Sequence, residues 1–297
     1  MTINLNKTQL PIIQKSSLPK DFKVLIRKDN EGKEKLVETH EMPDEIPEGH
    51  VLVKLAYAPI NPSDMMTFLN NSYGHKEKVK QAPIVPGFEG SGTVVKVSSG
   101  GDDSLVGKKV GIMQNIYSDE FIGTWRQYGL YKMESLIIFP QEAELDKIHS
   151  VFVNPATVYL MLQESLDKGY TSVVFNAAGS SLCRMAASLF SKNNIKTIMI
   201  VRRDEHIKEL KEKGATVVLN KTTESFDKDL DNAIKEYKPL GFFDAVAGPD
   251  AIKIYKKLDD FSTTYNYGAL SLKPFDGITA FDLIFHRKTL RYLFLIN

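Results

Sequence analysis

The chain has 297 residues, of which 42% are hydrophobic and 25% charged, and its net charge is +1 from 38 Lys and Arg against 37 Asp and Glu. This composition is typical of a soluble globular protein with room for two domains, and the balanced charge gives no reason to expect nucleic acid or an anionic membrane as a partner. No apolar run approaches the ~20 residues that span a bilayer. The single cysteine excludes an internal disulfide and a zinc site built from several cysteines.

The first half of the chain has the pattern of short β-strands separated by Gly and Pro. Strands are expected at 21–27, 50–58, 84–97, 106–112 and 123–131. A proline-rich loop at 58–74 leads into a short helix that Ser63 or Asp64 could cap. Many short strands of this kind predict a small β-barrel domain from residue 1 to 140.

After residue 140 the pattern changes to alternating strands and helices. A helix is expected at 142–163, and buried strands are expected to begin near residues 171, 196, 216, 242, 262 and 290. Helices at 182–192, 205–213, 226–237 and 250–258 separate the first five of these strands. This alternation predicts an α/β domain at 141–297 with a doubly wound parallel sheet that helices cover on both faces.

The stretch 171–183, TSVVFNAAGSSLC, combines the first of these strands with a turn of small residues and the start of a helix. Small residues let a ligand approach the backbone, and the helix start presents N–H groups and a positive dipole end to a phosphate. The glycine positions of the pattern G-x-G-x-x-G fall on Ala178, Ser180 and Cys183, and only Gly179 between them is glycine. By itself the turn fits a bound dinucleotide and a purely structural connection about equally well.

The second strand of this domain ends in VRRD, which places Arg202, Arg203 and Asp204 at its carboxyl end. NAD-binding domains commonly carry an acidic residue there, which holds the ribose hydroxyls. Two guanidinium groups favour a phosphate instead, because Arg binds phosphate through paired hydrogen bonds. The sequence thus predicts NADPH (NADP) as the cofactor, and a pair of surface arginines is the alternative interpretation.

Together these motifs resemble the zinc-independent branch of the medium-chain dehydrogenase/reductase superfamily, which contains quinone oxidoreductases and the mitochondrial type of trans-2-enoyl thioester reductase. The matching blocks run in family order: INPSD (60–64), NSYG (71–74), PGFEGSGTV (86–94), GTW (123–125), VNPATVYLML (153–162), VRRD (201–204) and YGALS (267–271). The resemblance implies a GroES-like β-barrel domain, a Rossmann domain, and a cleft between them for NADPH and a conjugated carbonyl substrate.

Metal-dependent relatives carry a zinc-binding Cys near INPSD and a His in the glycine-rich block, where this chain has Asn61 to Asp64 and Phe88. The six histidines show no ligand spacing, so we expect no zinc. Hydrogen-bond donors must then stabilise the charge on the enolate oxygen of the substrate. The resemblance implies Tyr73 as the proton donor and Asn61 as the residue that orients substrate or nicotinamide. A packed loop tyrosine and an Asn-Pro turn are the structural alternatives.

The resemblance also assigns the cofactor contacts. Asn154 would lie near the nicotinamide. The turn that holds the diphosphate would comprise Gly179, Ser180, Ser181 and Leu182, and the 2′-phosphate pocket would comprise Arg202, Arg203 and Asp204. The loop on the nicotinamide side would comprise Tyr267, Gly268, Ala269 and Leu270, and the last segment that lines the cofactor would comprise Leu293, Phe294 and Leu295.

Two features depart from the family pattern. Cys183 occupies a glycine position, where a side chain could crowd the helix against its strand. The chain also ends right after the expected sixth strand, 290–296 (LRYLFLI), whereas relatives continue with helices that return to the first domain, so a truncated chain or the lack of this closure is expected. Because relatives pair this strand with its copy, and an apolar strand edge is prone to association, we expect a homodimer through 290–296.

The sequence supports two functions. The first is NADPH-dependent reduction of an activated double bond or a quinone, with enoyl thioester, enone and quinone undecided. The second is a catalytically retired family member that serves as a structural or binding subunit, which the altered glycine positions favour. The first twenty residues lack an apolar signal core and contain no Arg, so a cytoplasmic location is expected, with mitochondrial import as the open alternative.

Overall fold

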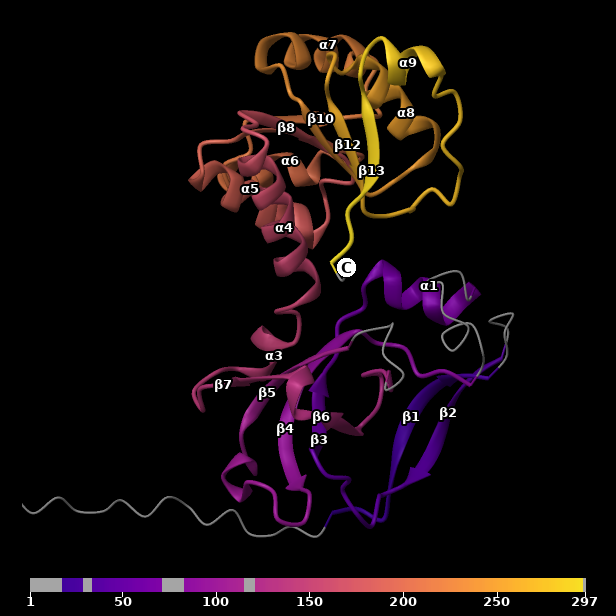
Figure 1. The fold of residues 1–297 in the computed structure, drawn as a ribbon, viewed down its shortest axis with the longest axis vertical. Helices are drawn as coiled ribbons and strands as arrows, with labels where there is room; N and C mark the ends of the chain where they lie inside the picture. Colours follow the sequence, from indigo (N-terminus) through magenta and orange to yellow (C-terminus); the bar gives the residue numbers. More distant parts are fainter. Residues whose placement is uncertain (1–17, 29–33, 71–82, 115–120, 296–297) are drawn as a thin grey trace, which may run out of the picture. The chain divides into compact units, whose positions relative to one another are not determined.

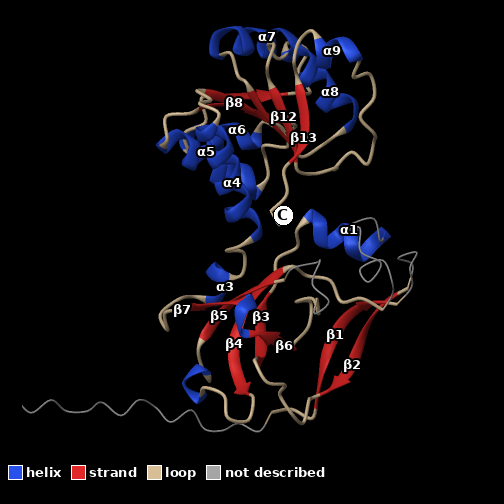
Figure 2. Cartoon of the chain, viewed as in Figure 1, coloured by secondary structure: helices blue, strands red, loops and turns tan. Residues whose placement is uncertain are grey.

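The computed structural model describes residues 18–28, 34–70, 83–114 and 121–295, and the chain divides into two compact units, 1–149 and 150–297 (Figure 1). Figure 2 shows how they differ: the first unit consists mostly of strands and loops, whereas the second alternates strands with helices. The change in the sequence pattern after residue 140, from short strands to alternating strands and helices, corresponds to this difference. The short helix α3 (Leu145–Ile148) belongs to the first unit, so the division falls between His149 and Ser150.

The described part of the first unit holds two antiparallel sheets. β1 (Asp21–Arg27) and β2 (Lys35–Glu41) form a two-stranded ribbon. The larger sheet has five strands in the order β6 (Tyr128–Lys132), β3 (His50–Tyr57), β4 (Glu89–Val97), β5 (Lys109–Met113) and β7 (Leu136–Phe139). Outside the strands lie α3, helix α1 (Pro62–Asn70) and the single 3₁₀ turns η1 (Asp103–Leu105) and η2 (Met133–Ser135).

Alternation along β3 explains why both faces of the five-stranded sheet are buried. Val51 and Val53 belong to one apolar cluster, together with Val110 and other residues of the sheet. Leu52, between them, belongs to a second cluster on the opposite side, which includes residues of β1. Because successive side chains of a strand point to opposite faces, this strand is covered on both sides, and the unit has a core on each face of the sheet.

Several strands of the first unit differ from the sequence expectation. β2 and β7 are not expected, because β2 carries charged side chains among its apolar ones and β7 has only four residues. β6 begins at Tyr128 rather than at residue 123, since Gly123 (φ +71°) turns against the Val85 carbonyl, where a Cβ would stand 2.1 Å from the oxygen. β4 begins only at Glu89, after a similar close approach at Gly87.

The second unit is built on a six-stranded parallel sheet with the order β10, β9, β8, β11, β12, β13. Its strands are β8 (Ser172–Phe175), β9 (Lys196–Val201), β10 (Val217–Asn220), β11 (Gly241–Asp244), β12 (Thr263–Asn266) and β13 (Thr289–Tyr292). This is the Rossmann order 3-2-1-4-5-6, in which ligands bind at the carboxyl ends of the strands where the order reverses. The expected doubly wound sheet is therefore confirmed.

Helices cover both faces of this sheet (Figure 1). On one face α4 (Val153–Asp167), α5 (Ser181–Lys192) and α6 (Glu205–Glu212) pack on a cluster that includes Phe175. On the other face α7 (Phe226–Tyr237) and α8 (Gly248–Lys257) pack on a cluster that includes Val174. No helix in the described residues is long and apolar enough to cross a membrane.

Three elements of the second half differ from expectation. The helix expected at 142–163 is divided into α3 and α4, and α4 starts at Val153, so that Pro155, which lacks an N–H, falls in its first turn. β13 ends at Tyr292 instead of residue 296. Helix α9 (Ala280–Ile284) is unexpected from the apolar periodicity and begins with a capping box between Thr279 and Asp282.

Candidate functional site

The turn between β8 and α5 has the geometry of an anion site. Ser180 is the N-cap of α5, and its Oγ accepts a hydrogen bond from the Cys183 N–H at 3.2 Å. The N–H groups of Ser181 and Leu182 belong to the first turn of the helix, which has no helical acceptors for them, at the positive end of the helix dipole. Ala177 has a left-handed φ of 47°, a strained conformation that is frequent at ligand-binding turns.

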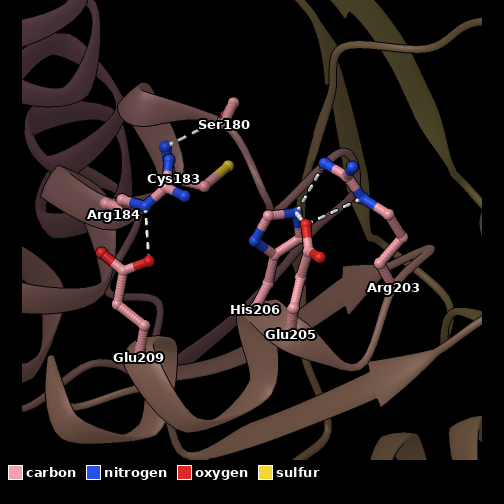
Figure 3. A network of polar contacts seen from close by, with 7 residues as sticks. All are labelled: Ser180, Cys183, Arg184, Arg203, Glu205, His206 and Glu209. Atoms are coloured by element: carbon pink, nitrogen blue, oxygen red, sulfur yellow. Dashed lines mark hydrogen bonds and ion pairs between the residues drawn. The ribbon is translucent and has the colours of Figure 1, made fainter.

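Cys183 does not crowd this turn. Its side chain is fully buried in the apolar cluster between α5 and the sheet, and its Sγ donates to the Asn176 carbonyl at 3.8 Å. Burial raises the pKa of the thiol to about 11. Arg184, the next residue, forms an ion pair with Glu209 of α6 at 2.8 Å (Figure 3). The core therefore accommodates the side chain at the glycine position, and the strand–turn–helix unit is intact.

Polar side chains brace the carboxyl ends of three neighbouring strands. Asp244 is fully buried at the end of β11 and accepts hydrogen bonds from the side-chain amides of Asn176 and Asn266 and from the Val246 and Ala247 N–H groups. These partners satisfy the carboxylate within the protein, so the ends of β8, β11 and β12 are held together. Sequence reasoning does not identify this network, although a polar residue at the end of each of three buried strands is a usable signal.

The predicted loop after β12 lies close to this network. A Cβ on Gly268 would stand 2.8 Å from the Ala245 carbonyl oxygen, so the close approach requires glycine. Tyr267 turns its buried hydroxyl toward the Cys183 thiol, and burial raises the pKa of this tyrosine well above its ordinary value. Ala269 and Leu270 are the exposed residues of this loop, whereas Tyr267 and Gly268 are half-buried.

The predicted arginine pair directly follows β9, and the structure adds a histidine to it. Arg203 Nη2 lies 3.1 Å from His206 Nε2. The Glu205 carboxylate lies 3.2 Å from Arg203 Nε and 3.6 Å from His206 Nε2 (Figure 3). Asp204, at the N-cap position of α6, accepts a hydrogen bond from Asn220 Nδ2 at 2.8 Å instead. Three ionisable side chains therefore meet at the start of α6.

The remaining predicted cofactor residues lie in the same unit. Arg202 is exposed at the start of the segment that follows β9. Asn154 is half-buried in the first turn of α4. The Leu293 N–H donates to the Asn266 carbonyl at 2.8 Å, directly after β13, and residues 294–295 are half-buried beyond it. The strand ends thus bring the β8–α5 turn, the 267–270 loop and Leu293 to one edge of the sheet.

In the first unit, Asn61 belongs to a buried polar cluster. Its Nδ2 donates to Glu89 Oε1 at 3.1 Å, and its backbone N–H donates to Asp64 Oδ2 at 2.7 Å. The Phe88 N–H donates to the other Asp64 oxygen at 3.0 Å. Burial raises the pKa of Asp64 to about 7, and the neighbouring Glu89 carboxyl adds to this rise. Asp64 therefore reaches back from the first turn of α1 to Asn61, and the Asn61 side chain is held in one orientation.

A groove of about 490 Å³ opens in the same unit. Its lining includes the exposed side chains of Tyr57 and Ile60, together with Trp125 and Arg126. Mostly apolar walls with one cationic side chain suit a ligand that combines an apolar chain with a polar or anionic group. Tyr73, the predicted proton donor, lies outside the described residues.

The described residues contain no group of three His, Cys, Asp or Glu side chains that could hold a metal ion. Phe88 takes the place at which metal-dependent relatives carry a ligand histidine, and its ring packs 5.5 Å from that of Phe121. Cys183 is buried in the core of the other unit. Zinc independence stays a prediction that the side chains at this place support.

Comparison with known proteins places the chain in a family. The alcohol dehydrogenase GroES-like domain matches residues 47–140. A mitochondrial enoyl-[acyl-carrier-protein] reductase of Caenorhabditis elegans is 31% identical over 81% of this chain and 67% of its own length. The chain belongs to the medium-chain dehydrogenase/reductase family.

Other proteins similar to this medium-chain dehydrogenase/reductase are two mitochondrial enoyl-[acyl-carrier-protein] reductases. That of Dictyostelium discoideum is 27% identical over 86% of this chain and 72% of its own length, and that of Rattus norvegicus is 32% identical over 75% and 59%. A solved structure of a candidate NADPH:quinone reductase from Mesorhizobium loti has a TM-score of 0.79 at 27% identity and covers 94% of this chain and 83% of that one. The chain spans 59% to 72% of the length of the three enoyl reductases.

Two further polar residues of this medium-chain dehydrogenase/reductase escape sequence reasoning. The His206 ring lies on the turn, since a Cβ on Gly179 would stand 2.5 Å from His206 Cδ2. No local pattern reveals this contact, because the two residues are far apart in the chain. Glu89 is almost completely buried, and an acidic residue inside the glycine-rich block is a signal that could have found it.

Proposed function

We propose that this protein is a zinc-independent, NADPH-dependent reductase that transfers hydride to an activated double bond or a quinone. Family membership makes the chain an oxidoreductase, whereas the cofactor, the substrate class and the independence from zinc are the proposal. The enoyl reductases of Rattus norvegicus and Caenorhabditis elegans and the candidate NADPH:quinone reductase support it by similarity. Enoyl thioesters, enones and quinones share an electron-poor conjugated carbonyl, and the enoyl thioester is the first substrate to test.

The observation that carries the proposal is the arrangement at the carboxyl edge of the parallel sheet. The turn capped by Ser180 lies at the end of β8, and Arg202 and Arg203 follow the neighbouring strand β9. NADPH differs from NADH by a 2′-phosphate, and guanidinium groups bind phosphate through paired, charge-assisted hydrogen bonds. The pair therefore supports NADPH as the preferred nucleotide.

The residues present fit such a dinucleotide. Cys183 faces the core rather than the turn, and Gly268 allows the 267–270 loop to lie against Ala245. The first N–H groups of α5 would hold the diphosphate and the arginine pair the 2′-phosphate, while Asn154, the 267–270 loop and residues 293–295 would line the nicotinamide half. When bound, NADPH supplies the hydride.

Reduction of a conjugated carbonyl places negative charge on the carbonyl oxygen and requires a proton at the α-carbon. Without a metal, hydrogen-bond donors must stabilise this charge. Asn61 is the candidate for orienting the reacting groups, because Glu89 and Asp64 fix its side chain and backbone. Tyr73 is the proposed proton donor, and the phenol pKa of ~10 keeps its proton available at neutral pH.

The same proposal includes a homodimer through the edge at 290–296. β13 is the outermost strand of the parallel sheet in the described residues, and Tyr292 on it exposes 70% of its surface. A strand edge beside exposed apolar side chains favours pairing with another chain. Light scattering at micromolar concentration should give the mass of two chains, and the mass of one chain would contradict the dimer.

The compartment stays a prediction. The similar enoyl reductases are named as mitochondrial proteins, so mitochondrial import is tested against a cytoplasmic location. Fractionation of cells that express the chain with a C-terminal tag distinguishes the two locations.

A catalytically retired member that acts as a binding subunit is the second candidate. The altered glycine positions of the turn favour it, since Gly179 is the only glycine there and the His206 ring lies against it. A catalytically retired member is expected to bind neither NADPH nor NADH.

Turnover and binding together decide between the candidates. NADPH oxidation is followed by absorbance with a crotonyl thioester, a simple enone and a quinone, each with and without a zinc chelator. We expect consumption of NADPH with at least one of them, unaffected by the chelator, and tighter fluorescence-detected binding of NADPH than of NADH. If the protein neither consumes NADPH nor binds either nucleotide, the reductase proposal is wrong and the retired subunit is the supported function.

A further inference from the structure

We propose that Arg203, Glu205 and His206 form a phosphate lock, in which the Glu205 carboxylate occupies the site for the adenosine 2′-phosphate until the phosphate replaces it and His206 takes up a proton. This inference rests on the proposed function, because it concerns the phosphate that distinguishes NADPH from NADH. Figure 3 shows the three side chains turned toward one another at the start of α6.

The distances define the resting state of the phosphate lock. Arg203 Nη2 lies 3.1 Å from His206 Nε2. A guanidinium can only donate hydrogen bonds, so Nε2 is the acceptor in this contact. Glu205 Oε1, at 3.2 Å from Arg203 Nε, supplies the counter-charge. The resting cluster thus pairs one guanidinium with the protein's own carboxylate, beside the His206 imidazole.

Exposure decides which of these contacts an incoming anion can displace. The side chains of Arg203 and Glu205 expose 68% and 61% of their surface, whereas that of His206 exposes 14%. An ion pair this exposed contributes little to stability, so a phosphate can replace the carboxylate. The His206 ring packs on Gly179, where a Cβ would stand 2.5 Å from it. The histidine is therefore fixed, and the glutamate is the movable group.

The other charged groups near His206 already have partners. Glu209, one turn further along α6, pairs with Arg184 of α5 at 2.8 Å, and this pairing lowers the pKa of the Glu209 carboxyl. Asp204 accepts a hydrogen bond from Asn220 of β10. Glu205 is thus the carboxylate that lies within 4 Å of both Arg203 and His206.

Phosphate binding changes the protonation of His206. A phosphate monoester carries a charge of about −1.5 to −2 near neutral pH, more than the carboxylate that it replaces. An opposite charge within ~4–6 Å favours the charged form of a titratable group, so the imidazole binds a proton when the phosphate enters. By linkage, the affinity for a 2′-phosphate then rises as the pH falls from about 8 to about 6.5. NADH, which lacks this phosphate, shows no such dependence.

Isothermal titration calorimetry with adenosine 2′,5′-bisphosphate tests the phosphate lock without the nicotinamide half of the cofactor. The full-length wild type, Glu205→Gln and His206→Gln are each titrated at about pH 6.5 and about pH 8. Glu212→Gln is the matched control, because it removes the same charge from the same helix at a surface pair with Lys208.

We expect Glu205→Gln to bind the bisphosphate about five- to tenfold more tightly than the wild type, because no carboxylate competes for Arg203. Glu212→Gln should match the wild type. His206→Gln should bind about tenfold more weakly at the lower pH and should lose the pH dependence of the wild type. His206→Asn serves as a second variant, and circular dichroism confirms that both are folded.

Equal affinities of Glu205→Gln and Glu212→Gln would overturn the phosphate lock, as would a pH dependence that survives in both histidine variants or a wild type that does not bind the bisphosphate. NADPH turnover tests the proposed function separately. If NADPH is consumed but the variants bind the bisphosphate as the wild type does, the proposed reductase stands and the phosphate lock is wrong. If the variants show the expected change in bisphosphate affinity but NADPH is not consumed, the phosphate lock stands and the proposed reductase is wrong.

Discussion

Each unit holds a polar cluster at a candidate site, and the two clusters differ in burial. In the first unit, Asn61, Asp64 and Glu89 expose 7%, 0% and 1% of their surface. In the second, the Arg203 and Glu205 side chains expose more than half of theirs. Buried polar groups must find their partners within the protein, whereas exposed ion pairs exchange partners with little loss. The first cluster therefore suits the orientation of a reacting group, and the second suits recognition of an ion that arrives from solvent.

The largest effect is expected where burial is complete and the partners are most numerous. Asp244→Ala removes the acceptor of two side-chain amides and two backbone N–H groups. Each buried donor left without an acceptor costs about 1–3 kcal/mol, so we expect the free energy of unfolding to fall by about 3–5 kcal/mol. Urea unfolding measures this, with Asp250→Ala as a control at a surface pair with Lys221. A loss below about 1 kcal/mol would show that the network does not brace the sheet.

The next largest effect is a pH dependence of stability in the first unit. Burial raises the pKa of Asp64 to about 7 in the folded protein, against about 3.9 in an unfolded chain. Between these values the folded state binds more protons than the unfolded state, so stability falls as the pH rises. We expect a decrease of about 2 kcal/mol between about pH 5 and about pH 7.5. Urea unfolding across this range should show a flatter profile for Asp64→Asn, and parallel profiles would contradict the assignment.

At the exposed cluster the effect should appear in ligand affinity rather than in stability. Arg202→Ala should weaken NADPH about tenfold, because one guanidinium contact to the phosphate is lost. NADH should change little, and the urea midpoint should stay that of the wild type. Fluorescence titration with both nucleotides checks this. Equal losses for NADPH and NADH would remove the argument for a 2′-phosphate site.

The smallest effect is expected at the half-exposed ion pair between Arg184 and Glu209. Its carboxyl oxygen lies 2.8 Å from the guanidinium Nε, yet both side chains remain accessible to water. Glu209→Gln should lower the urea midpoint only slightly at low salt, and about 1 M salt should abolish the difference because ions screen exposed charges. A large, salt-independent loss would mean that this pair behaves like the buried cluster of the first unit.

The second unit is predicted from sequence almost strand by strand. Parallel strands buried on both faces form short continuous apolar runs, such as KTIMIV in β9. The first unit is predicted less completely, because antiparallel strands such as β2 carry polar side chains and depend on partners elsewhere in the chain. The residue pattern within one segment does not show which distant strand will pair with it.

The candidate sites follow the same division. The turn at Ser180 and the arginines after β9 are predictable, since the carboxyl ends of parallel strands meet at one edge of the sheet. His206 and the partners of Asp244 are not, because their contacts join segments that only the fold brings together. The orientation of the Cys183 side chain toward the core is also not predictable, since a single sequence does not show which way a residue at a glycine position points.

The burial of Cys183 gives the protein an intrinsic reporter. Its thiol is the only one in the chain, it is fully buried, and its pKa is raised to about 11, so a thiol reagent can reach it only when α5 separates from the sheet. The rate of modification under native conditions therefore measures local opening of the Rossmann unit. A nucleotide that binds the β8–α5 turn would slow this modification in proportion to its occupancy, which turns one side chain into a binding assay that requires no turnover.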